Sequence, residues 1–401
     1  MFKTFSKFIS KEEFFYFVSY GIYLIYTFLT TTFFYSLFFQ ETIYKCLIIL
    51  CLVILIIKEI FFKKMSYMEI VGFCICLAFS IVLLRRMVGQ FSLLPFFFYI
   101  YSARDIPFEK IARFSFWLIG TLLIGTIFSA YIGIIPNYLD TLVAERDRYY
   151  LGFTYALNAS IVVLNLLSLD LYLHRKHPSL LRCITWFIIS FGIYYQTRSR
   201  LAFVSGSCII ISIYLASKFP NILKKRKCLN WFMNMSFVIC SVTGIFLTII
   251  YNSDIYWLVR VNTILENRLA LGKNALNLYG CKLLGMRIQY VGNGLDIFGN
   301  RKTGEYNYVD CLYVNILQKY GAIFLVGFIL ILTIMMFRLH KKNENCLLII
   351  MIFVSLRGLI DNTFFPLYFN TFWLIVGREV FGNYKKKHLE LNQGANYENI
   401  V

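Results

Sequence analysis

Residues 229–251, LNWFMNMSFVICSVTGIFLTIIY, form an apolar run without a charged side chain. A helix of this length crosses a hydrocarbon core of roughly 30 Å and satisfies its own backbone hydrogen bonds in lipid. The whole chain is similar: 59% of its residues are apolar and its mean hydropathy is +0.66. Only 15% are charged, whereas soluble proteins carry about 25%. The sequence therefore predicts an all-α, polytopic integral membrane protein.

Comparable runs recur along the chain and predict about twelve transmembrane helices. We expect these spans at residues 15–38, 43–62, 67–84, 88–103, 112–135, 153–173, 181–197, 201–219, 229–251, 312–337, 346–361 and 364–382. Neither a Pro- or Ser-rich linker nor an internal repeat divides the sequence. Residues 1–401 are therefore expected to form a single transmembrane domain.

The net charge of +19 reports orientation rather than nucleic-acid binding, because the basic residues concentrate on alternate connections. They form six groups: Lys58/Lys63/Lys64, Arg104/Lys110/Arg113, Arg175/Lys176/Arg182, Lys224/Lys225/Arg226/Lys227, Arg338/Lys341/Lys342 and Lys385/Lys386/Lys387. By the positive-inside rule, both termini are then cytoplasmic. Residues 252–311 become a large extracytoplasmic loop between the ninth and tenth spans.

This loop has a pattern of its own. Within residues 262–285, apolar residues spaced by three, four and seven positions predict an amphipathic helix that lies on the membrane or caps the bundle. The following residues are rich in glycine and asparagine, which is typical of a mobile lid. The loop is therefore the segment in which we expect chemistry.

The positive charges expected outside are nearly all arginines, which suit bidentate recognition of phosphate or carboxylate. The candidates for substrate binding or catalysis are Arg85, Arg86, Arg146, Arg148, Arg198, Arg200, Arg260 and Arg268. Anchoring of helix ends at the interface is the alternative, above all for Arg85 and Arg86. Arg357 has i, i+4 spacing to Asp361, which predicts either a structural ion pair or a substrate contact.

All four histidines fall on the cytoplasmic side, so a carboxylate or a tyrosine must serve as a base outside. Asp310 is the first choice and Glu266 the second. Asp310 has i, i+3 spacing to Tyr313, a candidate for substrate binding, if the tenth span has begun there. Helix capping is the alternative role of Asp310. The chain contains no Asp-x-Asp pair, which argues against a metal-dependent nucleotide-sugar transferase. Neither a metal nor another cofactor is expected.

Several short motifs, taken in order, resemble those of Wzy-type polymerases of oligosaccharide repeat units. They are RDRYYLGF at residues 146–153, TRSR at 197–200, ENRLALG at 266–272 and YVD at 308–310, with Tyr313 and Tyr320-Gly321 following. The family usually continues its Leu-Gly-Phe element with Pro-Asn, whereas here the asparagine is displaced to Asn158. The related O-antigen ligases are associated with an extracytoplasmic histidine, which this chain lacks. The resemblance thus favours a polymerase.

The resemblance implies a GT-C-like membrane enzyme that joins repeat units carried on undecaprenyl diphosphate at the outer face of the plasma membrane. A sugar hydroxyl attacks the anomeric carbon of the growing chain, and lipid diphosphate leaves. Arginines supply the cations without a metal, and Asp310 or Glu266 accepts the proton. A flippase and a chain-length regulator are possible partners. A lipid-linked oligosaccharide flippase and an O-antigen-type ligase stay open as alternatives.

Overall fold

The computed structural model describes residues 10–38, 40–61, 67, 70–75, 77–78, 94–141, 147–219, 227–301 and 303–382. The protein is mostly helical, as predicted. Its longer helices are α2 (Lys11–Leu29), α3 (Glu41–Phe61), α5 (Leu94–Ser102), α6 (Phe108–Tyr131), α7 (Asn158–Leu173), α8 (Leu180–Thr197), α9 (Arg200–Lys218), α10 (Lys227–Asn234), α11 (Ser236–Ile250), α12 (Tyr256–Ile264), α13 (Arg268–Tyr279), α14 (Leu312–Lys319), α15 (Ala322–Lys341) and α16 (Asn345–Arg357). Two short strands, β1 (Leu139–Asp140) and β2 (Arg148–Tyr149), pair antiparallel.

Within the described residues, three helices, α6, α9 and α15, are long and apolar enough to cross a membrane, and α7, α11 and α16 are shorter apolar helices. On α6, Ile119 and Leu123 face the core while Trp117, Ile124 and Phe128 are exposed. Large exposed apolar side chains of this kind favour contact with lipid over contact with water. The predicted all-α character is therefore confirmed, and these candidate membrane-spanning helices agree with the predicted membrane protein.

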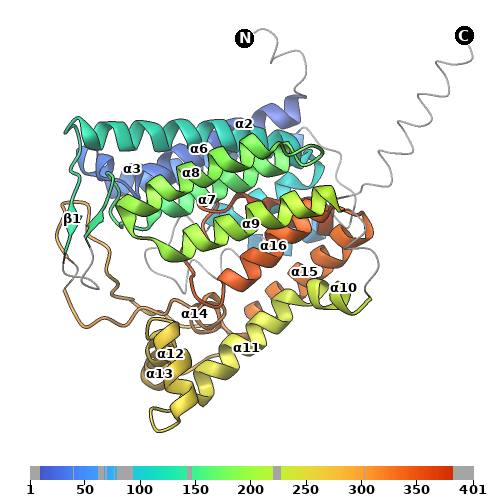
Figure 1. Ribbon diagram of the computed structural model, residues 1–401. Coiled ribbons are helices and arrows are strands. Elements are labelled where there is room, and N and C mark those ends of the chain that lie inside the picture. Colours follow the sequence, from blue (N-terminus) through green and yellow to red (C-terminus); the bar gives the residue numbers. More distant parts are fainter. Residues whose placement is uncertain are drawn as a thin grey trace, which may run out of the picture.

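Helix α7 lies at the centre of the bundle and is buried on every side, from Asn158 to Tyr172. Helices α6, α8 and α9 pack against it, and α16 packs against α9 (Figure 1). The polar side chain of Asn165 in its middle is satisfied by Thr371, whose backbone N–H donates to it and whose hydroxyl accepts from it, both at 3.2 Å. A buried amide paired in this way carries no desolvation penalty for an unmet hydrogen bond.

Ion pairs gather at one end of the bundle, where the predicted cytoplasmic connections meet. Lys110 at the start of α6 lies 2.8 Å from Glu13 in the first turn of α2. Arg175, which follows α7, lies 3.7 Å from Glu109 and 4.0 Å from Glu344, the residue before α16. Lys110 and Arg175, from two of the basic groups that set the predicted orientation, therefore lie at the same end of the molecule.

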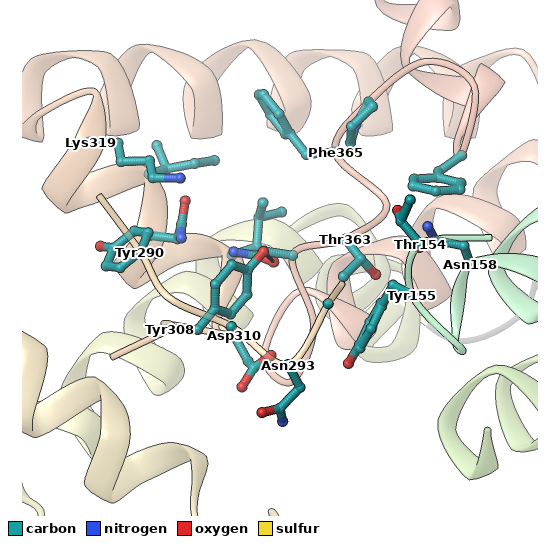
Figure 2. Close-up of a pocket in the computed structure, with 18 of the residues that line it drawn as sticks. Thr154, Tyr155, Asn158, Tyr290, Asn293, Tyr308, Asp310, Lys319, Thr363 and Phe365 are labelled. Atoms are coloured by element: carbon teal, nitrogen blue, oxygen red, sulfur yellow. Dashed lines mark hydrogen bonds between the residues drawn. The ribbon is translucent and has the colours of Figure 1, made fainter. Parts of the chain in front are cut away.

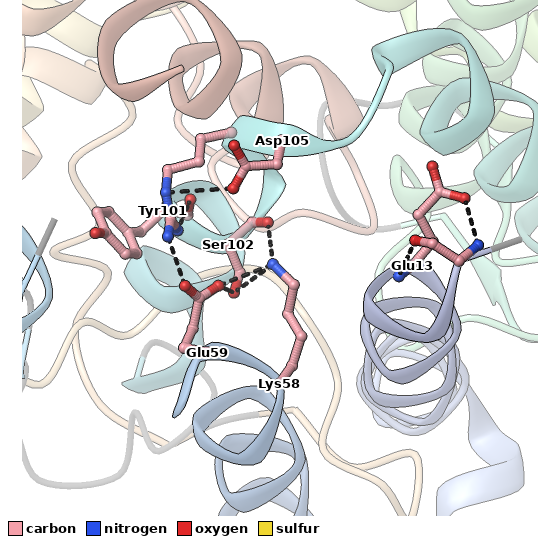
Figure 3. Close-up of polar contacts among 8 residues, drawn as sticks. Glu13, Lys58, Glu59, Tyr101, Ser102 and Asp105 are labelled. Carbon is pink, nitrogen blue, oxygen red and sulfur yellow. Dashed lines mark hydrogen bonds and ion pairs between the residues drawn. The ribbon is translucent and has the colours of Figure 1, made fainter. Parts of the chain in front are cut away.

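Two of those basic residues are buried instead of facing an aqueous loop. Figure 3 shows Lys58 of α3 between Glu59 and Ser102, with distances from its Nζ of 2.8 Å to the carboxylate and 2.9 Å to the Ser102 carbonyl. Arg104 also binds Glu59, at 2.6 Å, and lies 3.5 Å from Asp105. A buried charge needs such partners because desolvation is costly. The network ties α3 to the turn that follows α5.

The opposite end is built from the connection 132–157 and the large loop. Backbone hydrogen bonds of 2.9 and 2.8 Å join Thr154 N–H to Thr31 and Leu295 N–H to Thr154. Arg301 of the loop pairs with Asp140 of β1 at 2.7 Å. The glycine-rich part of the loop, predicted as a mobile lid, is thus docked on this connection through named contacts.

The predicted span 312–337 is wrong as a single helix, because the chain breaks between α14 and α15. Gly321 has a φ of +94°, and a Cβ there would meet the carbonyl oxygen of Leu283 at 2.3 Å. Only glycine accepts both this backbone angle and this approach without strain. The large loop therefore wedges against the start of α15, which sequence hydropathy does not detect.

The predicted span 364–382 is wrong as one regular α-helix. Its helical part holds two short helices of other types, Thr371–Leu374 and Gly377–Phe381, with Trp373 and Leu374 fully buried. Pro366 lacks an N–H to donate, and the Asn370 side chain accepts from a backbone N–H in competition with regular helix. The large apolar residues of this segment therefore pack in the core. The predicted spans 67–84 and 88–103 lie partly outside the described residues.

Candidate functional site

A cavity of about 450 Å³ lies between the start of α7, the loop residues 290–310, helix α14 and residues 362–369. Figure 2 shows Lys319 and Tyr290 on one side, Tyr155 and Asn158 on the other, and Asp310 between them. Aromatic and amide side chains dominate the lining: Tyr155, Tyr290, Tyr306, Tyr308, Tyr320, Tyr368, Asn158, Asn293, Asn315 and Asn362. Burial raises the pKa values of Tyr306 and Tyr308, so their hydroxyls stay protonated.

Asp310 is fixed by the backbone around it. The Val309 carbonyl accepts hydrogen bonds from the Asn362 side chain at 2.8 Å and from the Asn315 side chain at 3.1 Å. Helix α14 begins two residues after Asp310, at Leu312, with Cys311 at its N-cap and no side-chain capping bond. Asp310 therefore lines the cavity without capping the helix, which removes the alternative role that its position suggested.

Opposing charges set the ionisation of Asp310. Its pKa is raised from an ordinary value of 3.8 to about 6, chiefly by burial, and the nearby Asp361 and Glu266 carboxylates oppose the lowering effect of Arg268. The Arg268 Nε lies 3.8 Å from Asp310 Oδ2, and both side chains are about 15% exposed. A carboxyl with a pKa near 6 is a stronger base than an ordinary aspartate while remaining largely ionised at neutral pH.

Arg268 and Glu266 reach this acid through a corner between two helices. The range 262–285, predicted as one amphipathic helix, instead holds the end of α12 and then α13, because Glu266 and Asn267 both adopt left-handed backbone angles, with φ of 52° and 64°. Asn262 holds the corner, donating to the Asn267 side chain at 3.0 Å. Arg268 then starts α13 and also donates to the Ile360 carbonyl. Glu266 remains exposed at the rim.

Arg357 and Asp361 form the ion pair that their spacing predicted. Both are buried, and Arg357 Nε lies 3.0 Å from Asp361 Oδ2 while the guanidinium covers the Phe364 ring at 5.2 Å. The second Asp361 oxygen accepts from the backbone and hydroxyl of Thr363, at 2.8 and 2.6 Å. Arg357 therefore stabilises the turn that carries Thr363, and Thr363 lines the cavity.

Tyr313 lies in the helix packing and not in the cavity. It is fully buried, and its hydroxyl donates to the Ser355 carbonyl at 2.8 Å. The predicted i, i+3 relation to Asp310 assumed a helix that included both residues. Because α14 starts only at Leu312, the two side chains diverge, and the expected substrate contact of Tyr313 has no geometric support.

The remaining predicted arginines do not share the cavity. Arg198 stacks on Tyr195 at 4.9 Å, and Arg260 stacks on Tyr256 at 5.1 Å. Arg200 is exposed at the first residue of α9, and Arg148 lies in β2 with a buried Nε that has no hydrogen-bond partner. Among the described residues that line the cavity there is no arginine. Three predicted residues, Arg85, Arg86 and Arg146, lie outside the described part of the chain.

The cation that does line the cavity is Lys319, which the sequence reasoning missed. Its Nζ lies 4.6 Å from the centre of the Tyr290 ring. Hydropathy placed Lys319 inside the predicted span 312–337, as one charged residue in an apolar run. A lysine following Asn315 and Gln318 in an apolar run is a signal of function, because intramembrane charges are costly.

No three His, Cys, Asp or Glu side chains gather as metal ligands among the described residues. No protein-family model, no curated protein and no solved structure matches this chain.

Proposed function

We propose that the chain is a polytopic membrane enzyme that polymerises oligosaccharide repeat units carried on undecaprenyl diphosphate. The observation that carries this proposal is Asp310, whose pKa is about 6 beside Arg268 at a cavity lined by tyrosines and amides. The proposal keeps a twelve-span, GT-C-like topology with both termini cytoplasmic. The ion-paired end of the bundle faces inward, and the cavity opens at the outer face of the plasma membrane.

The lining of the cavity suits carbohydrate. Tyrosine rings stack against the apolar faces of sugars and offer a hydroxyl at their edge. The side chains of Asn158 and Asn293 add both donors and acceptors, which match the alternating needs of sugar hydroxyls. The volume of about 450 Å³ holds a short oligosaccharide rather than a whole polymer. Growth of the chain then requires repeated release and rebinding.

The chemistry balances with the residues present. Asp310 accepts the proton of an acceptor hydroxyl as that oxygen bonds to the anomeric carbon of the donor. The bond from this carbon to the diphosphate breaks, and its electron pair leaves with the lipid diphosphate. Arg268, as the guanidinium nearest to the reacting acid, offsets the charge that develops on the leaving group. Glu266 at the rim holds the pKa of Asp310 up and is the weaker candidate base.

A complementation experiment tests the proposal. A strain lacking the gene receives Asp310→Asn, Arg268→Ala or the matched control Glu305→Gln, which alters an exposed acid of the same loop. We expect the first two variants to lose long polymer while single units still reach the surface, and the control to make polymer of normal length. Normal polymer from both site variants, at equal protein levels, contradicts the proposal. Units retained inside the cell indicate a flippase, and unattached chains of normal length indicate a ligase.

A further inference from the structure

Lys319 is the last residue of α14, and neighbouring side chains hold its amine toward the cavity. Tyr290 lies beneath the amine, and the Tyr290 hydroxyl donates to the Gln318 side chain at 2.8 Å. Gln318 in turn donates to the carbonyls of Ala275 and Gly280, at 3.0 and 3.3 Å, near the end of α13. Figure 2 shows the amine directed away from α14 toward the centre of the cavity. Tyr290 and Gln318 therefore fix the position of the Lys319 amine.

The described part of the chain brings no acid to this amine. No carboxylate among those residues lies within ion-pair distance of Lys319, and its named contact is the face of Tyr290. The fully buried cations Lys58 and Arg357, by contrast, are each paired with an acid, Glu59 and Asp361. Placing an ammonium in a confined site without a counter-charge is costly. A ligand that supplies the anion removes this cost.

The positions of Asp310 and Lys319 at the two ends of α14 narrow the choice of anion. Asp310 precedes the helix and Lys319 is its last residue, so their backbones are separated by about 10 Å along an axis that rises about 1.5 Å per residue. This separation is about the length of a disaccharide. The proposed function assigns the diphosphate to Arg268, the cation beside Asp310, which leaves Lys319 for an anion farther along the substrate.

We propose that Lys319 binds an anionic group, a carboxylate or a phosphate, on a sugar of the repeat unit about two rings from the bond being made. The proposal rests on the proposed function for the identity of the ligand. It makes the substrate an acidic oligosaccharide, and it makes Lys319 a residue of specificity and not of catalysis. Loss of a single charge-assisted contact of this kind weakens binding by about tenfold or more.

The probe is the oligosaccharide released by mild acid from the lipid-linked unit that accumulates in the deletion strain, since this fragment no longer carries the diphosphate. Mass spectrometry establishes whether its anion is a carboxylate or a phosphate, and binding to purified full-length protein is measured by calorimetry. We expect Lys319→Gln to bind this oligosaccharide at least tenfold more weakly than the wild type, and Lys319→Arg to recover part of the loss. The control Lys282→Gln, at an exposed lysine of the large loop, should match the wild type.

A second fragment, neutralised by amidation of its carboxylate or by removal of its phosphate, should bind equally to the wild type and to Lys319→Gln. A repeat unit without an acidic sugar overturns the proposal. So does equal binding of the charged fragment by Lys319→Gln and the wild type, or a loss that persists with the neutralised fragment. Lys319-dependent binding by a protein that does not lengthen lipid-linked units leaves this inference standing and refutes polymerisation alone.

Discussion

Replacing Arg268 by glutamine should move the acid limb of the pH profile to higher pH. Two unit charges 3.8 Å apart attract by about 4 kcal/mol at an effective dielectric constant of about 20 and by about 1 kcal/mol in water. Since both side chains are about 15% exposed, we take about 1.5–3 kcal/mol, which is about one to two pKa units. The pKa of Asp310, about 6 with Arg268 present, then rises to about 7–8.

The assay is the rate of polymerisation by protein in lipid nanodiscs, measured as kcat/KM from about pH 5 to about pH 9, because this ratio reports the ionisation of the free enzyme. Asp310 must be ionised to accept a proton, so activity is lost as pH falls through its pKa. Arg268→Gln should lose about 10-fold or more at the acid end beyond any uniform drop in rate. Glu266→Gln should shift the limb the opposite way, because that carboxylate raises the pKa. A limb that stays in place in both variants refutes Asp310 as the base.

Two further predictions concern the loop that covers the cavity. Gly285→Ala should lower the free energy of unfolding by about 2–4 kcal/mol, because a Cβ there meets the carbonyl at the end of α14 at 2.1 Å. Gly133 has a similar positive φ but open space around it, so Gly133→Ala should lower the free energy of unfolding by about 1 kcal/mol. Equal losses in thermal unfolding contradict this. Arg301→Ala removes the ion pair with Asp140, worth about 1 kcal/mol, and should speed amide exchange of residues 291–301 several-fold relative to an Arg260→Ala control. Unchanged exchange shows that the pair does not hold the loop.

Features that depend on local composition could be predicted from the sequence. The helical character follows from hydropathy within short windows, and part of the loop that the sequence singled out, residues 290–310, borders the cavity. The pairing of Arg357 with Asp361 follows equally from one turn of helix. Asp310 and Arg268 were chosen as acid and cation of one loop, and the chain brings them within 3.8 Å.

Features that depend on distant parts of the chain could not be predicted. The end of α14 is decided by Gly321, where the carbonyl of Leu283 comes too close for any side chain. Hydropathy averages over this point and extends the helix through it. The same break turns Lys319 from an anomaly inside a span into the final residue of a helix that borders a cavity. No window of sequence contains both sides of that contact.

The arginines show that a residue type predicts the kind of contact a side chain makes more reliably than it predicts the site at which the side chain lies. A planar guanidinium is favoured wherever it can stack on a ring or grip a carboxylate, and Arg198, Arg260 and Arg357 each do so within their own neighbourhood. The excess of arginine over lysine in the predicted extracytoplasmic connections therefore has several local causes, and these do not require a common ligand. Lys319 has no such acid among the described residues. We therefore propose that the cation best placed to recognise substrate is the one whose charge the described part of the protein leaves unbalanced.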